Sequence, residues 1–284
     1  MTRPVQRILL QTTIPFVEDD WHAGRFSLLA RTMSELGDQV TARDRATRAG
    51  VDDPVLSKLS RDDFDQLWLI AVDTGDGITP AECAAIADFR EQGGAVFVTR
   101  DHMDLGSSVC RLGGIGAAHH FHTKQPPAES ERVRDDTFTQ SISWPNYHSG
   151  SNGDVQRILP VMPVHPVLRR ADGSTLETLP SHPHEGSVSA PQSDKNARVV
   201  ATGTSKVTGR PFNIAVAFES QGDAGRGWAE STFHHFCDYN WDPRLGCPSF
   251  VSEPPSDAIE QDPALLDDTK AYVRNLVAWL SALA

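Results

Sequence analysis

The alternation of short apolar runs with amphipathic stretches over the first 100 residues most constrains the fold of this chain. Continuous apolar character predicts buried strands, whereas apolar residues recurring at helical spacing predict helices. We expect strands at residues 7–12, 39–43, 64–73 and 95–99, and helices at 24–36 and 80–89. Strands and helices that alternate with short connections predict an α/β three-layer sandwich, flavodoxin-like, with a mostly parallel central sheet.

The start of the second helix carries a local signal of its own. Thr79 stands at the predicted N-cap, Pro80 at the first helical position and Glu82 three residues after the cap. This spacing predicts a capping box, in which the Thr79 side chain and the Glu82 carboxylate satisfy backbone amides reciprocally. Gly93 and Gly94 then end the helix before the next strand.

Regular periodicity is lost over the middle of the chain and returns near its end. Residues 106–197 are rich in Pro, His, Ser and Gly, and a structureless loop of that length is uncommon in a compact domain. We therefore expect short strands and turns laid over the carboxyl edge of the sheet. Further strands are predicted at 198–202, 212–218 and 225–230, and a terminal helix at 263–283. Residues 1–284 are predicted to form one domain with an elaborated middle.

The net charge limits the classes of partner that this protein can bind, and the cysteine pattern indicates its redox compartment. The formal charge of −12, from 38 acidic and 26 basic residues, disfavours binding to nucleic acid or to anionic membranes and favours a small polar molecule. No apolar run approaches the roughly 20 residues of a membrane span, and the start does not read as a signal peptide. Four scattered cysteines without a CxxC pair indicate reduced thiols in a cytoplasm.

Two segments carry a resemblance to a known family. The run Ile-Thr-Pro-Ala-Glu-Cys-Ala-Ala-Ile-Ala-Asp-Phe-Arg-Glu-Gln-Gly-Gly-Ala-Val-Phe-Val-Thr, residues 78–99, resembles a segment of ThuA-like proteins, in the class I glutamine amidotransferase-like superfamily. Residues 225–236, Gly-Arg-Gly-Trp-Ala-Glu-Ser-Thr-Phe-His-His-Phe, resemble their late segment, which a terminal helix follows. The resemblance implies their fold and, because ThuA-like proteins are linked to trehalose-type sugar utilisation, a polar, carbohydrate-like substrate.

The same resemblance disfavours glutamine hydrolysis. In true amidotransferases of the superfamily a cysteine occupies the sharp turn after the strand that matches residues 95–99. Here that turn holds Arg100, Asp101 and His102, and Cys110 comes several residues too late. We expect both Cys110 and Cys237 to be buried and unreactive, and the glycines at 113, 114 and 116 to serve turns and not a phosphate loop.

Asp101 and His102 directly follow a predicted central strand. Ligands of open parallel sheets bind beyond the carboxyl ends of the strands, and these side chains suit proton transfer or metal ligation. A second candidate is His182-Pro183-His184-Glu185, where the extended backbone around proline would place the two histidines on one side and Glu185 on the other. Each segment also has a purely structural interpretation. Asp101 could cap the turn that follows it in a polar loop, and the histidines at 182 and 184 could belong to a plain loop or to an interface with a partner.

The third candidate follows the late strand at residues 225–230. If the chain is helical from Thr232 onward, the Asp238 carboxylate could orient His234 or His235. On extended chain the two adjacent histidines must face opposite ways, so at most one is expected to serve chemistry directly and the other to bond backbone in a packed corner. The three histidines within residues 119–122 could line a cleft or face a partner.

These clusters predict an enzyme, a hydrolase or isomerase, that acts on a small polar molecule by acid/base or metal-assisted chemistry. The predicted catalytic residues are Asp101, His102, His234, His235 and Asp238, and the predicted substrate-binding residues are His184, Glu185 and Trp241. A divalent metal would be held by members of the set His102, His182, His184 and His234. Two alternatives stay open: a noncatalytic binding or assembly module, which includes homo-oligomers, and, more remotely, a cysteine-dependent amidase.

Overall fold

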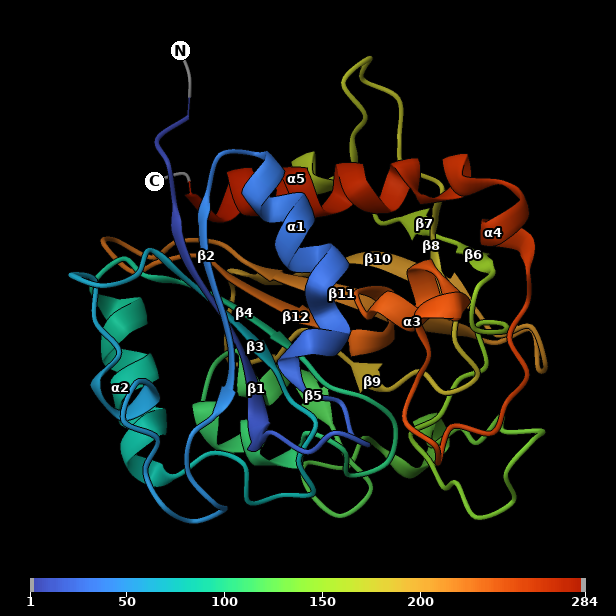
Figure 1. The fold of residues 1–284 in the computed structure, drawn as a ribbon, viewed down its shortest axis with the longest axis horizontal. Helices are drawn as coiled ribbons and strands as arrows, with labels where there is room; N and C mark the ends of the chain where they lie inside the picture. The colour runs from blue at the N-terminus through green and yellow to red at the C-terminus, as the bar shows by residue number, and fades with distance from the viewer. Residues whose placement is uncertain (1–2, 282–284) are drawn as a thin grey trace.

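A computed structural model describes residues 3–281 as a sheet covered by helices on both faces (Figure 1). The strands of the main sheet are β1 (Arg7–Pro15), β2 (Gln39–Arg45), β3 (Gln66–Ile70), β4 (Ala95–Thr99), β7 (Leu159–Pro160), β10 (Ala197–Thr204), β11 (Pro211–Phe218) and β12 (Gly227–Glu230). The α-helices are α1 (Ser27–Glu35), α2 (Pro80–Glu91), α3 (Asp238–Trp241), α4 (Ala258–Gln261) and α5 (Asp267–Ser281).

The main sheet has the order β2-β1-β3-β4-β12-β11-β10-β7. Its first five strands are parallel neighbours, β11 pairs antiparallel with β12 and β10, and β7 closes the far edge antiparallel to β10. The predicted α/β three-layer architecture with a mostly parallel sheet is therefore confirmed. Every strand predicted from periodicity is present, with ends that differ by up to three residues.

Alternate residues of each central strand feed two separate cores, as the two-residue period of a strand requires. Ile8 and Leu10 pack with α1 and α5 on one face of the sheet, whereas Leu9 packs with α2 on the other. Figure 1 shows α1 and α5 lying together, with α2 well apart from them. Because both faces are covered, the open edge at the carboxyl ends of the strands is where polar side chains can gather.

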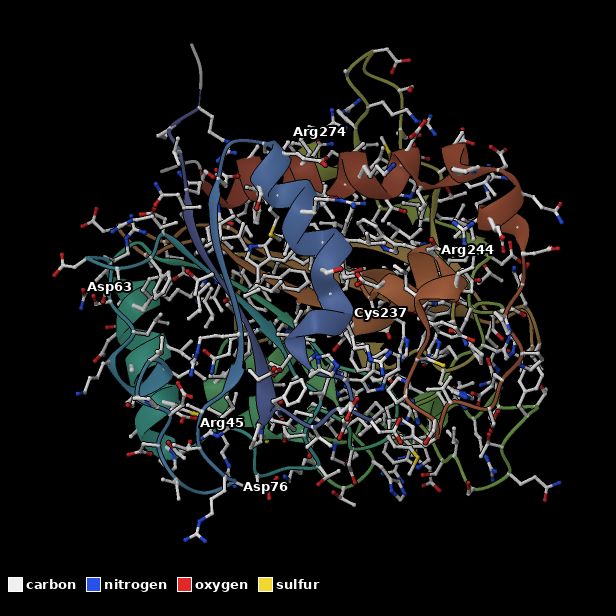
Figure 2. The ribbon with its side chains drawn as sticks, viewed as in Figure 1. Arg45, Asp63, Asp76, Cys237, Arg244 and Arg274 are labelled. Atoms are coloured by element: carbon white, nitrogen blue, oxygen red, sulfur yellow. The ribbon has the colours of Figure 1, made fainter. Side chains whose placement is uncertain are left out.

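The predicted capping box is confirmed at α2. The Thr79 hydroxyl accepts from the Glu82 amide, and the Glu82 carboxylate accepts from the Thr79 amide at 3.0 Å. Glu82 also forms a buried ion pair with Arg45 of β2, at 2.7 Å, which ties the helix to the sheet edge; Arg45 is labelled in Figure 2. The helices predicted at 24–36 and 263–283 are α1 and α5, and each is preceded by a 3₁₀ turn. Leu283, the predicted end of the terminal helix, lies outside the described residues.

The middle segment contains short elements, as its composition predicts. They are β5 (His119–His120) paired with β9 (Ser187–Val188), and β6 (Val155–Arg157) paired with β8 (Thr178–Pro180). The 3₁₀ turns of the chain are Ala23–Phe26, Leu56–Lys58, Ser107–Leu112, Gly116–Ala118, Glu129–Glu131, Pro166–Leu168, Phe233–His235, Pro243–Leu245 and Pro263–Leu266. Over residues 3–281, no helix has the length and apolar character that crossing a membrane requires.

Candidate functional site

The carboxyl ends of β4 and β12 bring the first and third candidate segments together. These strands are parallel neighbours, with Thr99 opposite Glu230. Beyond them the Phe233 amide donates to the Arg100 carbonyl at 2.8 Å, and the Thr232 hydroxyl lies 3.3 Å from the Asp101 carboxylate. Segments 130 residues apart in sequence thus form one wall because their strands pair in register.

The second candidate segment crosses over these two strand ends. The Ser149 amide donates to the His182 carbonyl at 3.0 Å and so holds the segment in place. Gly186 makes the crossing possible: a Cβ there would stand 2.6 Å from the Asp101 carbonyl oxygen and 2.7 Å from that of Ser231. Only glycine allows so close an approach of three backbone segments.

A cavity of about 340 Å³ opens where the three segments meet. Its ionisable lining comprises Asp101, His102, His182, His184, His234 and Glu253. Trp21 and Phe250 contribute apolar walls, and Trp21 packs edge-on against the His234 ring with 4.9 Å between ring centroids. A few convergent polar groups in an otherwise apolar cavity of this size are typical of small-molecule sites.

Asp101 is the charged centre of this lining. It is buried, which alone would raise the pKa of its carboxyl group, but His102 and His234 outweigh burial and hold the pKa well below the usual range. The Asp101 Oδ2 atom lies 3.0 Å from His102 Nδ1 and 3.2 Å from His234 Nε2. The contact with His102 is close but lacks hydrogen-bond geometry, whereas that with His234 has it. Asp101 is therefore an ionised carboxylate at physiological pH.

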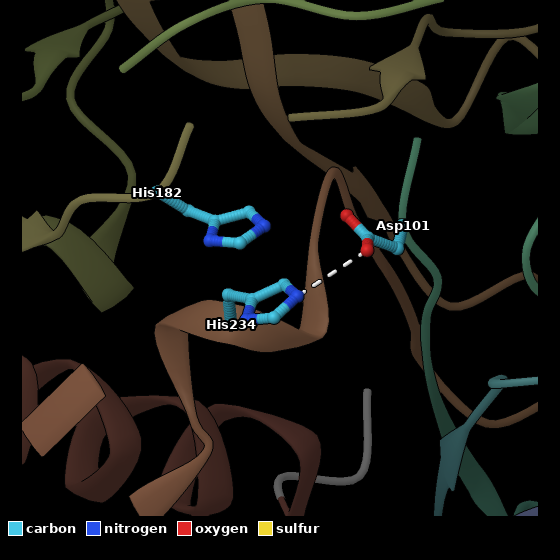
Figure 3. Close-up of side chains that lie close together, drawn as sticks. All are labelled: Asp101, His182 and His234. Carbon is cyan, nitrogen blue, oxygen red and sulfur yellow. Dashed lines mark hydrogen bonds and ion pairs between the residues drawn. The ribbon is translucent and has the colours of Figure 1, made fainter. Parts of the chain in front are cut away.

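His182 and His234 stack face to face beside Asp101, with ring centroids 3.3 Å apart (Figure 3). The His182 Nδ1 atom is 2.7 Å from Asn152 Oδ1, and His234 Nδ1 is 3.3 Å from Asn240 Oδ1. An amide oxygen only accepts, so each ring carries its proton on Nδ1 and turns Nε2 towards Asp101. Burial and the neighbouring His234 hold the pKa of His182 well below its usual value, so His182 is neutral.

His184 forms a second polar pair in the same cavity. Its Nε2 lies 2.8 Å from Glu253 Oε1, and its ring centroid is 4.9 Å from that of His102 and 5.3 Å from that of His182. This contact lowers the pKa of Glu253 to about 2. The pair can donate or take up a proton opposite Asp101, which is the arrangement that general acid/base chemistry needs.

His235 faces away from the cavity into a fully buried network. Its Nδ1 lies 2.8 Å from Glu230 Oε1 and its Nε2 lies 3.0 Å from Glu185 Oε1. Burial would lower the pKa of His235, but the two carboxylates raise it to about 10. Ser231 donates to Glu185, and Tyr272 donates to Glu230. The predicted roles of His235 in catalysis and of Glu185 in substrate binding are corrected here, because neither side chain lines the cavity.

Asp238 and Trp241 also lie outside the cavity. Asp238 orients neither histidine: its carboxylate accepts from the Ser27 and Leu28 amides, at 3.1 and 2.8 Å, and so caps the first turn of α1. Trp241, the last residue of α3, is buried and donates its indole N–H to the His235 carbonyl at 2.8 Å. The chain turns as a 3₁₀ helix at residues 233–235, so the helical spacing on which the prediction for Asp238 depended does not occur.

Burial makes two of the cysteines poor nucleophiles, whereas Cys110, which was expected to be buried, is half-buried. Cys237, labelled in Figure 2, is fully buried beside α3, and burial raises the pKa of its thiol far above the usual value. Its Sγ lies 2.9 Å from Asn240 Oδ1, to which it donates. Burial also raises the pKa of Cys83, to about 11. Neither thiol is poised for catalysis, since attack requires the thiolate.

A larger cavity, of about 590 Å³, opens at the opposite edge of the sheet, near Val5 and Asp223. It lies at the amino ends of the parallel strands, and its lining among residues 3–281 contains no histidine. Ligands of open α/β sheets bind at the carboxyl edge. The smaller cavity, which lies at that edge and is lined by four histidines, is therefore the better candidate.

Sequence reasoning missed several residues of this site, among them Trp21, Asn152, Asn240 and Glu253. Asn152 lies in the Ser-Asn-Gly turn at 151–153, and Glu253 stands alone before two prolines. Neither position has a motif around it. Asn240 was visible in the crowded run from Phe233 to Asp242, but nothing local indicates that its amide bonds Asn152, 88 residues away.

No protein-family model matches this sequence, and no curated protein sequence matches it. Among solved structures, the mmIFT52 N-terminal domain is similar over 97% of both chains, at 14% identity and a TM-score of 0.51. Cytoplasmic Protein STM3548 from Salmonella typhimurium is similar over 96% of this chain and 98% of its own, at 12% identity and a TM-score of 0.50. At such identities these two likenesses show a common fold and nothing about function.

A ThuA-like protein from Parabacteroides merdae ATCC 43184, of the kind that the sequence resembles, is also similar. The likeness covers 80% of this chain and 79% of that one, at 14% identity and a TM-score of 0.49. A score below 0.5 adds no argument to the fold, which the sheet order itself defines. The class is thus an α/β protein with a mostly parallel central sheet and a histidine-rich cavity at the carboxyl edge of that sheet.

Proposed function

We propose that this protein is an enzyme that acts on a small polar molecule, carbohydrate-like in its chemistry, bound in the cavity at the carboxyl ends of β4 and β12. One observation carries the proposal. Four histidines and two carboxylates from segments far apart in sequence line a single cavity of about 340 Å³. Buried ionisable groups that gather in one cleft are more typical of active sites than of structural cores.

The chemistry divides between two sides of the cavity. On one side the ionised Asp101 holds His102 and His234, and on the other the His184–Glu253 pair lies 2.8 Å apart. A hydroxyl-rich molecule between them could give a proton to one side and take one from the other. The reaction classes that this arrangement serves are hydrolysis and isomerisation, both of which need paired proton transfers.

The noncatalytic alternative draws less support from this geometry. A binding or assembly module that had lost its chemistry would have no reason to keep buried, ionisable side chains aimed into one cavity, because each costs free energy to desolvate. Scattered histidines on separate faces would favour such a module. The observed clustering favours the enzyme, and we extend the proposal to a cytoplasmic setting on the strength of the scattered free thiols.

A ligand screen tests the proposal. The purified protein would be heated with hexoses, disaccharides and polyols at about 10 mM, and hits followed by calorimetry and by NMR for turnover. A ligand present at 100 times its Kd stabilises by about 2.7 kcal/mol, which raises Tm by several degrees. We expect His102→Ala and His184→Ala to weaken binding about tenfold or more.

His122→Ala is the matched control, because His122 is exposed and lies outside the cavity lining. It should bind like the unaltered protein. Ligand binding that survives in both cavity variants, or a protein that none of these molecules stabilises, would contradict the proposal.

A further inference from the structure

We propose that Asp101, His182 and His234 together bind one divalent transition-metal ion, of the zinc class, at the inner end of the cavity. The inference deepens the proposed function and rests on it for the ion's role, since the ion would lie where a substrate meets Asp101. Its existence as a site rests on geometry alone. Three observations support the site: the spacing of the donor atoms, the unpartnered lone pair of His182 and the residues that orient both rings.

The three donor atoms already stand close to coordination distance. One ligand atom from each residue lies within 4.8 Å of the other two, and all three residues are buried. His234 Nε2 and Asp101 Oδ2 are 3.2 Å apart. Donor atoms joined to zinc by bonds of roughly 2.0–2.1 Å at tetrahedral angles stand about 3.4 Å from each other. The largest separation would have to shorten by up to about 1.4 Å, and the two stacked rings would have to tilt towards each other, to complete the three-ligand set.

His182 supplies an independent sign that a ligand belongs here. Its side chain is buried, and its Nε2 has no hydrogen-bond partner among the described residues, although Nδ1 is bonded to Asn152. A buried nitrogen lone pair without a donor costs free energy. That Nε2 points to the same place as His234 Nε2 (Figure 3).

Two asparagines fix both rings in the ligating tautomer. Asn240 donates to Asn152 Oδ1 at 3.0 Å and to the Ser181 carbonyl at 2.7 Å, so its own Oδ1 is turned to His234. Histidine ligands of metals commonly donate their other ring nitrogen to a fixed oxygen in this way, which sets the tautomer and raises the basicity of the ligating nitrogen. This interlocked amide pair holds two histidines at once.

Hydrogen bonds among Asp101, His182 and His234 do not satisfy all three donor atoms. With His234 Nδ1–H directed to Asn240, His234 Nε2 needs a second proton to face Asp101, and His182 Nε2 gains no partner even then. One cation between them would satisfy all three donor atoms. Two imidazoles and one carboxylate suit transition metals, whereas magnesium and calcium prefer oxygen ligands alone. The remaining coordination position would open to the cavity, where an ion can polarise a substrate oxygen.

Zinc binding by the full-length protein tests the site without any substrate. The protein would be stripped with EDTA, dialysed and titrated with ZnCl₂ by calorimetry, in competition with a chromophoric chelator. We expect one Zn²⁺ per chain with a Kd below about 1 µM, and no measurable binding of Mg²⁺ at the same concentrations. Co²⁺ in place of Zn²⁺ should give the visible absorption bands of a four-coordinate site. Absence of stoichiometric zinc binding would overturn the inference.

Variants then assign the ligands. His182→Ala and His234→Ala should each lower zinc affinity by about 100-fold or more, and Asn152→Ala by about 10–100-fold through the lost orientation of His182. His122→Ala should bind zinc unchanged, and circular dichroism checks that each variant is folded. Unchanged zinc affinity in folded His182→Ala protein would also overturn the inference.

The two proposals fail separately. A small-molecule ligand bound in the cavity of a protein that takes up no zinc would overturn the metal site and leave the proposed function standing. Stoichiometric zinc at these residues, with no small molecule bound by either form, would contradict the proposed function and support the metal site.

Discussion

Two adjacent histidines of this chain have opposite environments. His235 is bonded through both ring nitrogens to the buried carboxylates of Glu185 and Glu230. His234 is bonded to an asparagine on one side and turns its other nitrogen into the cavity beside Asp101. In the first region, around His235, every side-chain nitrogen and oxygen of His235, Glu185 and Glu230 has a partner within the protein. In the second, around His234, the Nε2 atom of His182 has no partner among the described residues. Saturated bonding indicates a structural role, and unsatisfied donor atoms aimed at a cavity indicate a functional one.

The largest expected effect comes from breaking the saturated region. His235→Ala would leave two buried carboxylates facing each other without a cation, which typically costs about 3–5 kcal/mol of unfolding free energy. Urea denaturation at pH 7, followed by circular dichroism, measures this cost.

His182→Ala is the control from the other region, because it removes a buried histidine that makes a single side-chain bond, to Asn152. We expect it to cost about 1–2 kcal/mol in the metal-free protein. Equal losses for the two variants would remove the contrast between the regions.

The second largest effect is expected in the pH dependence of stability, which should distinguish the surroundings of His235 from those of His234. The folded-state pKa of His235 is raised to about 10, against about 6.5 for an unfolded chain. A raised pKa means that the folded protein binds the proton more tightly, so this stabilisation is complete below pH 6.5 and is lost as pH rises through 10. The unfolding free energy should therefore fall between pH 7 and pH 10.

His235→Gln stays neutral at every pH, so its stability should lack this component. Independently, the His235 ring should keep the NMR chemical shifts of an imidazolium up to about pH 9. A neutral His235 ring at pH 8 would refute the prediction.

Gly186 lies where the segment that begins at His182 crosses the carboxyl ends of β4 and β12. Gly186→Ala would force a Cβ against the Asp101 and Ser231 carbonyl oxygens, and overpacking of this kind costs about 1–3 kcal/mol. Because Gly186 follows Glu185 in the chain and touches the backbone of Asp101, we expect stability and zinc affinity to fall together. Gly114→Ala, at a position whose added Cβ has only the Arg90 side chain nearby, at 3.7 Å, should change stability by less than about 0.5 kcal/mol.

The smallest effect is expected for Glu253, which is bonded to His184 in the cavity lining. The pKa of Glu253 is lowered to about 2 by its bond to His184, so its stabilisation is present above pH 4.5 and is lost as pH falls towards 2. Glu253→Gln should cost about 1 kcal/mol or less at pH 7, and the difference from the unaltered protein should vanish near pH 2. A constant difference across this range, measured by thermal unfolding, would show that ionisation of Glu253 contributes nothing.

The sheet could be predicted because its signals are local. Residues 95–99 form a continuous apolar run and β4 has the same bounds, while the capping box of α2 depends on residues three apart. The placement of Asp101 after β4 follows from that strand alone. The ends of the helices were harder to predict, since α1 and α5 each begin with a 3₁₀ turn whose length depends on packing.

The site could be predicted only in part, for a physical reason. The segments that hold His102, His182, His184 and His234 were identified from sequence, and all four line one cavity. The role proposed for Asp238 did not survive, because its partner, the Ser27 amide, lies 211 residues away along the chain. Trp241 donates to the His235 carbonyl and lies outside the cavity lining. Asn152 and Glu253 carried no local signal at all.

The sequence by itself determined the α/β architecture and the strand ends at which polar side chains collect, because strand period, helix spacing and capping act over a few residues. Only the tertiary structure decided which histidine of the pair at 234–235 meets the cavity. His234 bonds Asp101 across 133 residues and His235 bonds Glu185 across 50, so their difference arises from long-range pairing that no local pattern contains. A 3₁₀ turn after β12 then points the two rings into different surroundings.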